Sequence, residues 1–195
     1  MAVNKAKSFK FKILLASASP RRQELLSQMG FDLQIVRLPT TEETYPQNLF
    51  REEIAVYLAE KKAGTYNNLQ ENEILITADT IVWMDGKVLG KPENYSDAFQ
   101  MLKFLSGKKH YVLTGVCIKS LNKTVVFYAE TMVKFAELSD EEIRFYIENY
   151  KPYDKAGAYG IQEWIGKVGI EYIEGSYYNV VGLPVQKLYR ELLRF

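Results

Sequence analysis

Near the start of the chain, a short polar turn joins an apolar run to a segment with two adjacent arginines. Ser17–Arg22 reads Ser-Ala-Ser-Pro-Arg-Arg and follows the apolar run Phe11–Ala16. Ser19 suits a helix N-cap and Pro20 the first helical position, so the pattern predicts a strand, a turn and a helix starting at Pro20. The backbone N–H groups at a helix N-terminus have no partner within the helix, which makes this end a predicted anion site.

Arg21 and Arg22 would lie in the first turn of that helix, where each positive charge opposes the helix dipole by about 0.3–1 kcal/mol. A bound phosphate would offset this cost, because a guanidinium group donates paired hydrogen bonds to phosphate oxygens. Ser17 and Ser19 would add hydroxyl groups to the same anion site. The motif alone is equally compatible with two solvated surface arginines beside an ordinary cap.

Asp79 is the second candidate, because it lies in an apolar context. It stands between Ile74–Ile76 and Ile81–Trp83, where a carboxylate is disfavoured both as a strand former and as a buried charge. We expect Asp79 and Thr80 to interrupt the strand. A strand-end aspartate exposed in a cleft could bind Mg²⁺ or act as a general base toward water. The alternative is an Asp that marks a strand end or accepts a hydrogen bond from Thr80.

Two lysines could neutralise phosphate charge. Lys62 lies at helical spacing from Ile54 and Leu58 and so continues the apolar stripe of a predicted helix. Lys91 stands between a glycine and a proline, where little flanking bulk hides it. Taken singly, Lys62 is better explained as a lysine that reaches solvent from an apolar face, and Lys91 as a plain loop residue.

Two further segments carry polar groups that suit a nucleotide ligand. Glu42 and Glu43, in a polar loop, could supply a metal ligand or form a solvated acidic loop. In Lys155–Gln162, small residues would let a ligand approach the backbone, and the amide of Gln162 could read a base edge. A glycine-rich loop is weak support by itself, so these residues gain weight only in combination with the others.

Composition narrows the possible functions. The chain has 195 residues, 47% of them hydrophobic, and a net charge of +1, which indicates a folded protein with no global attraction to nucleic acid or anionic membranes. One histidine and one cysteine exclude a zinc site that needs several such ligands, and argue against a Ser-His-Asp hydrolase. No P-loop motif, signal peptide or apolar run of about 18 residues is present. We therefore expect a reduced, cytoplasmic compartment.

Helical and strand patterns alternate along the chain, and Asp85-Gly86 reads as a tight hairpin turn. We therefore predict an α/β fold with a mixed, partly antiparallel sheet flanked by helices, in one domain over residues 1–195. The predicted strands cover 11–16, 33–36, 74–84, 111–119, 124–135 and 170–173; the predicted helices cover 49–66, 96–105 and 139–150, with others starting at 20 and 184.

In combination, these segments resemble the Maf family of nucleotide pyrophosphatases. The order and the spacing of the motifs agree with the family from Ile13 to the final helix, and the joint match is far more specific than any single piece. The motifs are Ala16–Arg22, Ala78-Asp79-Thr80, Leu89–Pro92, Leu105-Ser106-Gly107, Asp154–Gln162, Gly175-Ser176-Tyr177 and Val180–Pro184.

The resemblance implies two lobes around a cleft, similar to the house-cleaning nucleotide pyrophosphatases, in a homodimer that needs a divalent cation such as Mg²⁺ or Mn²⁺. It implies that Asp79 is the proton acceptor or organises the metal, and that Glu43 is a metal partner. It also implies that a nucleoside triphosphate substrate is held through its phosphates by six residues: Ser17, Ser19, Arg21, Arg22, Lys62 and Lys91.

Within the family, the chain resembles the branch that hydrolyses dTTP and UTP, through Arg21, Thr80 and Gln162. One departure is Glu163, where members of that branch usually carry glycine. The resemblance predicts hydrolysis of dTTP or UTP to the monophosphate and pyrophosphate. The balanced charge predicts no nucleic-acid or membrane partners. The alternatives are the 7-methyl-GTP branch of the same family, and a nucleotide-binding regulator of cell division without turnover.

Overall fold

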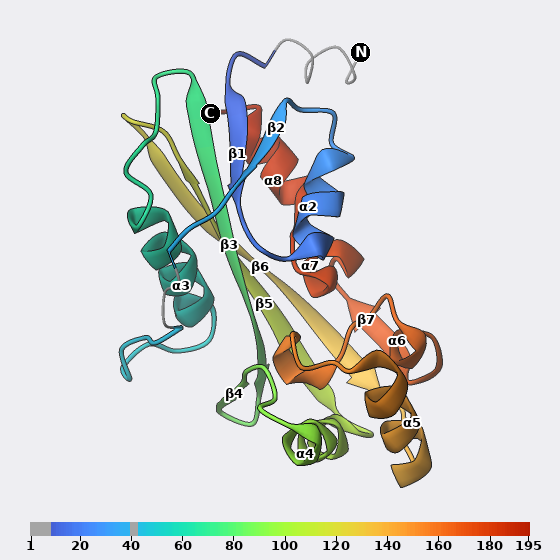
Figure 1. The fold of residues 1–195 in the computed structure, drawn as a ribbon. Coiled ribbons are helices and arrows are strands. Elements are labelled where there is room, and N and C mark those ends of the chain that lie inside the picture. The colour runs from blue at the N-terminus through green and yellow to red at the C-terminus, as the bar shows by residue number, and fades with distance from the viewer. Residues whose placement is uncertain (1–8, 40–42) are drawn as a thin grey trace. The chain divides into compact units, whose positions relative to one another are not determined.

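The computed structural model describes residues 9–39 and 43–195 (Figure 1). Glu42 therefore lies outside the described residues, whereas Glu43 lies within them. In chain order the elements are β1 (Lys12–Ala16), α2 (Pro20–Ser27), β2 (Leu33–Val36), α3 (Glu52–Gly64), β3 (Glu73–Met84), β4 (Lys87–Leu89), α4 (Tyr95–Leu105), β5 (Lys109–Lys119), β6 (Thr124–Phe135), α5 (Asp140–Tyr150), the 3₁₀ turn η1 (Ala156–Ala158), α6 (Trp164–Val168), β7 (Ile170–Glu174), α7 (Tyr177–Val181) and α8 (Val185–Leu192).

The strands of the described part form one sheet in the order β2-β1-β3-β5-β6-β7, with β4 paired to β3. The pairs β1–β2 and β1–β3 are parallel, whereas β3–β4 and β6–β7 are antiparallel. Only the short segment 120–123 joins β5 to β6, which is too short for a parallel crossover. The predicted mixed, partly antiparallel sheet flanked by helices is therefore confirmed.

Contacts between residues divide the chain into two compact units. The first unit comprises Met1–Asp79, Thr114–Ala129 and Gly182–Phe195, and the second comprises Thr80–Leu113 and Glu130–Val181. The strands β3, β5 and β6 each continue along the chain from one unit into the other. One domain over residues 1–195, with a cleft, stays a prediction.

In the first unit, alternate residues of β1 face two different helical layers. Ile13 and Leu15 belong to a buried cluster with residues of α2 and α8, and Leu14 and Ala16 belong to another with residues of α3. Figure 1 shows α3 on one side of the sheet and α2 with α8 on the other. This explains the continuous apolar run of the strand, because both of its faces are covered.

The second unit has a core of its own, in which α4 and α5 bury their apolar faces. Leu102 of α4, Phe135 of β6 and Tyr146 of α5 are completely buried there. The helix starts follow local chemistry: Asn94 accepts a capping hydrogen bond from the N–H of Asp97, and Ser139 forms the predicted capping box.

Two local predictions are wrong. Asp79 and Thr80 do not interrupt the strand, because β3 runs unbroken through both, and Asp79 is 6% exposed rather than open at a strand end. The ion pair with Lys62 compensates the buried charge. The helix predicted from residue 49 starts instead at Glu52. The φ of Arg51 is 50°, which is outside the right-handed helical region, so the helix cannot begin before this residue.

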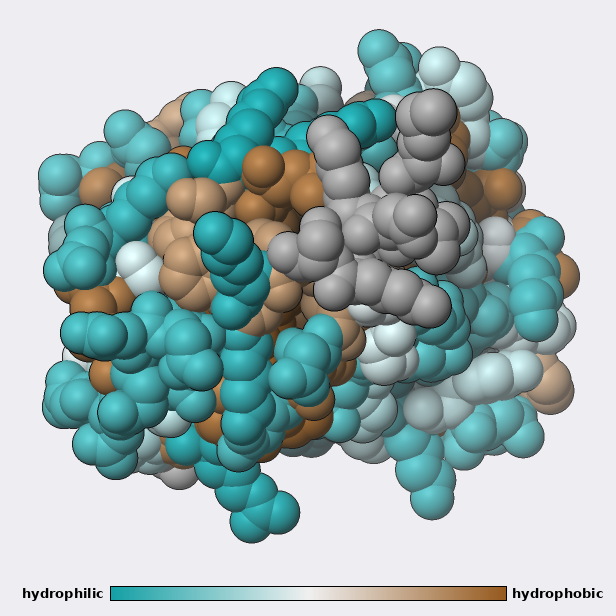
Figure 2. Space-filling model, turned by 90° about the horizontal axis from the view of Figure 1, so that it is seen from above, coloured by the Kyte–Doolittle hydropathy of each residue, from teal (hydrophilic) through white to brown (hydrophobic). Residues whose placement is uncertain are grey.

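None of the helices in the described ranges combines the length and apolar character that crossing a bilayer requires. The face seen from above carries mostly hydrophilic residues, with hydrophobic ones showing between them (Figure 2).

Candidate active site

Small residues bring α3 unusually close to the sheet of the first unit. The hydroxyl of Thr77 on β3 donates to the carbonyl of Ala59 on α3 at 2.6 Å. A Cβ atom at Gly115 of β5 would lie only 2.2 Å from the carbonyl oxygen of Ala55, so no larger residue fits there. The close approach is what places the last turn of α3, with Lys62, beside the middle of β3.

Lys62 joins two carboxylates into one cluster. Its ammonium group donates to Oδ1 of Asp79 and lies 3.2 Å from Oε1 of Glu43. The side chain of Asp79 is 8% exposed, that of Lys62 20% and that of Glu43 44%, so the cluster runs from the interior to the surface. The structure thus brings together three of the residues that the sequence singled out, and orders them around a single cation.

Arg22 is fixed next to the same carboxylate by backbone acceptors. Its Nη1 donates to the carbonyl of Ala78 at 2.7 Å, and its Nε donates to the carbonyl of Gly182 at 2.8 Å. Burial lowers the pKa of Arg22 from its usual value, and the charge of Asp79 opposes that shift. The arginine and the aspartate therefore share one locality, but the bracing role of Arg22 toward two backbone segments was not predicted.

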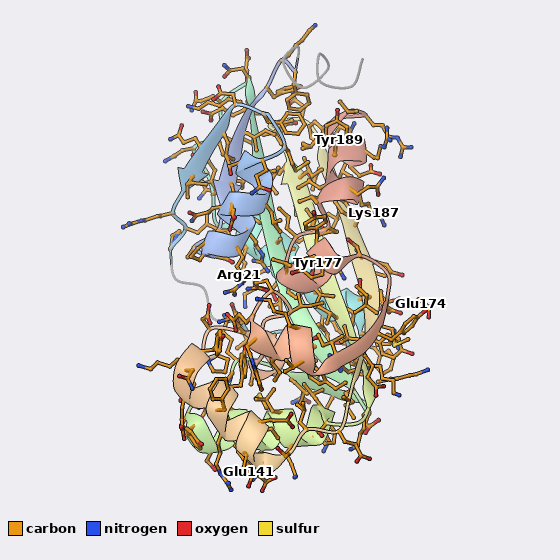
Figure 3. All side chains as sticks on the ribbon, turned by 90° about the vertical axis from the view of Figure 1, so that its right-hand side faces the viewer. Arg21, Glu141, Glu174, Tyr177, Lys187 and Tyr189 are labelled. Atoms are coloured by element: carbon orange, nitrogen blue, oxygen red, sulfur yellow. The ribbon has the colours of Figure 1, made fainter. Side chains whose placement is uncertain are left out.

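The start of α2 retains the features expected of an anion site. Ser19 occupies the N-cap position without a side-chain capping hydrogen bond, and the first turn holds no acidic residue. The backbone N–H of Ser19 donates to Oγ of Ser17 at 3.2 Å, and the amide of Gln23 donates to the carbonyl of Ser17 at 2.9 Å. Figure 3 labels Arg21 at this end of the helix. Among the described residues, α2 itself therefore supplies neither an acidic side chain in its first turn nor a side-chain cap.

The remaining predicted residues belong to the second unit. Thr80 follows Asp79 directly on β3 and is half-buried. Lys91 is exposed, and its loop is tied to η1 because the N–H of Gly157 donates to the carbonyl of Gly90 at 2.9 Å.

Gln162 follows η1 and is half-buried, with its Oε1 atom buried. That oxygen accepts no hydrogen bond from any group in the described part of the chain. A buried acceptor without a donor costs about 1–3 kcal/mol, which a ligand donor would recover.

The lone histidine and the lone cysteine are both buried. Burial lowers the pKa of His110 to about 3, and its Nε2 lies 2.7 Å from the hydroxyl of Tyr159 in the core of the second unit. Burial also raises the pKa of Cys117 to about 11, so this thiol is not an activated nucleophile.

The donor set suits a hard cation shared with a ligand. Among the described residues no group of three or more His, Cys, Asp and Glu side chains could hold a metal by itself. Asp79 and Glu43 nevertheless converge on one positive charge, the ammonium of Lys62. Mg²⁺ is commonly bound through one or two carboxylates together with substrate phosphates, and two convergent carboxylates fit that mode.

Known proteins resemble the chain along nearly its whole length. The family model described as Maf-like protein matches residues 12–195. A dTTP/UTP pyrophosphatase of Phocaeicola vulgatus is 59% identical over 184 residues, 94% of this chain and 95% of that protein. Proteins of the same name from Bacteroides thetaiotaomicron and Flavobacterium psychrophilum are 54% identical (94% of this chain, 95% of that protein) and 53% identical (93% of each).

Among solved structures, the Staphylococcus aureus Ham1 protein overlaps 65% of this chain and 72% of its own, with 16% identity and a TM-score of 0.46. The match to the family model from β1 to the C-terminus, with relatives more than half identical over the same length, shows that the chain belongs to the Maf-like protein family.

Proposed function

We propose that the protein is a nucleoside triphosphate pyrophosphatase that hydrolyses dTTP and UTP to the monophosphate and pyrophosphate. The proposal draws on relatives of that name that are 51–59% identical to this chain. The observation that carries it is the cluster of Lys62, Asp79 and Glu43, with the guanidinium of Arg22 bound to the residue preceding the aspartate. Such a cluster unites a base and cations, which hydrolysis of a phosphoanhydride requires.

Asp79 is the proposed general base. In its ion pair with Lys62 it is a carboxylate, so it can accept a proton from a water molecule that attacks the α-phosphorus. The oxygen of that water forms the new bond to phosphorus, and the bond from the α-phosphorus to the bridging oxygen breaks. The electron pair of that bond leaves with pyrophosphate.

The cations of the first unit bind and stabilise the phosphates. The positive charges of Lys62 and Arg21 stabilise the negative charge that builds up on the departing pyrophosphate. Arg22 donates to two backbone carbonyls, which keep its positive charge in a fixed position. Ser17 and Ser19, with the N–H groups at the start of α2, would donate to phosphate oxygens. Lys91, from the second unit, is proposed to add a further positive charge.

We further propose that Mg²⁺ or Mn²⁺ is held by Asp79 and Glu43 together with phosphate oxygens. The cation would neutralise triphosphate charge and polarise the scissile phosphorus, which is the contribution that divalent metals make in this chemistry. The residues themselves orient the substrate and move the proton.

Gln162 is proposed to select the base, with Thr80 as a second substrate contact. Uracil and thymine present an N–H donor at N3, whereas cytosine presents an acceptor there. The buried, unpaired Oε1 of Gln162 would accept a hydrogen bond from N3–H of uracil or thymine. With cytosine it would face a second acceptor and stay unpaired. This supports preference for dTTP and UTP over CTP.

A panel of triphosphates assayed for pyrophosphate release with Mg²⁺ tests the proposal. We expect dTTP and UTP to be turned over at least about 10-fold more efficiently than CTP and 7-methyl-GTP. A preference for 7-methyl-GTP would assign the chain to the other branch of the family, and tight binding without turnover of any nucleotide would indicate a regulator.

The homodimer, the cytoplasmic location and the absence of nucleic-acid and membrane partners are part of the same proposal. Light scattering of the purified protein would measure the oligomeric state. Mobility shifts with DNA and RNA, and cell fractionation, would test the other three.

A further inference from the structure

An ionic network centred on the buried Lys155 links residues on both sides of Gln162 in the second unit. The ammonium group of Lys155 lies 3.1 Å from Oε1 of Glu163 and 2.7 Å from Oδ1 of Asp154. The side chain of Lys155 is 9% exposed and that of Glu163 18%, so this ion pair is largely desolvated. A desolvated, hydrogen-bonded charge pair holds its geometry more tightly than a surface pair does.

Tyr146 of α5 connects this pair to the backbone. Its hydroxyl donates to Oε2 of Glu163 and accepts from the N–H of Gly160 at 3.0 Å. Burial, and secondly the hydrogen bond to Glu163, raise the pKa of Tyr146 above its usual value, so the phenol stays protonated. One hydroxyl on the buried face of α5 thus connects this helix to both ends of the turn from Gly160 to Glu163.

The carboxylate of Glu163 also packs directly over the start of that turn. The N–H of Glu163 donates to the carbonyl of Gly160 at 3.0 Å. A Cβ atom at Gly160 would lie 2.9 Å from Cδ of Glu163 and 3.1 Å from Cε of Lys155. Gln162 therefore extends from a turn whose two ends are joined through the hydroxyl of Tyr146 and the carboxylate of Glu163.

We propose that Glu163 is a positioning residue that sets the orientation of the Gln162 amide before substrate binds. The inference rests on the proposed function, in which that amide reads the pyrimidine base. An ordered amide oxygen discriminates a donor from an acceptor more sharply than a mobile one, because the wrong base then leaves buried polar groups unpaired. The glycine expected at this position from the family resemblance could not supply the carboxylate.

The test uses Glu163→Gln and Tyr146→Phe, each of which keeps the volume of the side chain. The first removes the charge that binds Lys155, and the second removes the hydroxyl that binds Glu163 and Gly160. For both variants we expect KM for UTP to rise and the ratio of kcat/KM for UTP over CTP to fall, each by at least about 10-fold, with kcat changed less than about 3-fold.

A second tyrosine–glutamate pair, which joins Tyr95 of α4 to Glu148 of α5, provides the matched control. The hydroxyl of Tyr95 donates to Oε1 of Glu148, an exposed residue of α5. Glu148→Gln and Tyr95→Phe should leave KM and the UTP-to-CTP ratio unchanged. Thermal unfolding of all four variants shows whether they fold.

The outcomes separate the two proposals. If the wild-type protein releases no pyrophosphate from UTP or dTTP, the proposed function is wrong, and this inference fails with it. An active, discriminating wild type whose Glu163→Gln variant is less stable but keeps KM and the UTP-to-CTP ratio overturns the positioning role alone. An equal loss of discrimination in the Glu148→Gln control would overturn it as well.

Discussion

Replacing Asp79 by Asn tests the assignment of the general base with little change in shape. The substitution keeps the size of the side chain but removes its charge and its ability to accept a proton from water. General bases typically contribute about 10²–10⁴-fold to rate, so kcat for dTTP should fall at least about 10²-fold, equivalent to about 2.7 kcal/mol of transition-state stabilisation.

The same substitution should affect stability far less than activity. Two opposite charges about 4 Å apart attract by about 4 kcal/mol at an effective dielectric of about 20, but removing a buried charge also removes its desolvation cost. Lys62 keeps a second carboxylate, Glu43, at 3.2 Å. We therefore expect the free energy of unfolding to change by less than about 2 kcal/mol in either direction.

Pyrophosphate release from dTTP with Mg²⁺ measures the activity, and urea denaturation measures the stability. Asp85→Asn is the matched control, because Asp85 is an exposed residue in the hairpin turn directly after the same strand and Asn tolerates its φ of 49°. Its activity should equal that of the wild type. Turnover within about 3-fold of the wild type in a folded Asp79→Asn variant would refute the base assignment.

Three further predictions follow from packing, burial and the donor set. Gly115→Ala should lower the free energy of unfolding, measured by urea denaturation, by more than about 2 kcal/mol, because the added Cβ would collide with the carbonyl of Ala55. Gly64→Ala is the control: the added Cβ would have no atom within 4 Å, so this variant should be as stable as the wild type. Burial lowers the pKa of His110 to about 3, so below pH 6.5 the unfolded chain binds a proton at this residue and the folded chain does not. Between pH 8 and pH 5 the free energy of unfolding should therefore fall by about 2 kcal/mol more in the wild type than in His110→Gln. Identical pH profiles of the two proteins would contradict this prediction. Chelation by EDTA should abolish pyrophosphate release, and added Mg²⁺ or Mn²⁺ should restore it. Full activity in EDTA would contradict the proposed requirement for a divalent metal.

Features set by neighbouring residues were predictable from the sequence. The hairpin after β3 follows from Asp85-Gly86, whose φ angles of 49° and 77° these two residue types readily adopt. The capping box at Ser139 likewise depends on residues three positions apart. The start of α2 at Pro20 was equally local, and all three predictions are confirmed.

Features that depend on distant partners were not predictable. The strand was expected to break at Asp79 because a lone carboxylate is costly in an apolar run, and nothing local reveals that Lys62, 17 residues earlier, pairs with it. Arg22 reaches the carbonyl of Gly182, 160 residues away along the chain. Residue chemistry therefore identified the candidates, but only the fold shows which of them meet.

The only sequence signal for the close helix approach was a set of small residues. Ala55, Ala59 and Ala63 recur at helical spacing, and Gly115 interrupts a strand of larger residues. Read together, they could have suggested a helix lying against the sheet backbone, and hence the placement of Lys62. Each residue alone is too common to carry that inference.

Hydrolysis of dTTP in ¹⁸O-labelled water tests the central claim most directly. If water activated by Asp79 attacks the α-phosphorus, mass spectrometry should find one labelled oxygen in dTMP and none in the pyrophosphate released in equal amount. Label in pyrophosphate, or release of orthophosphate with dTDP, would place the attack at another phosphorus and contradict the account.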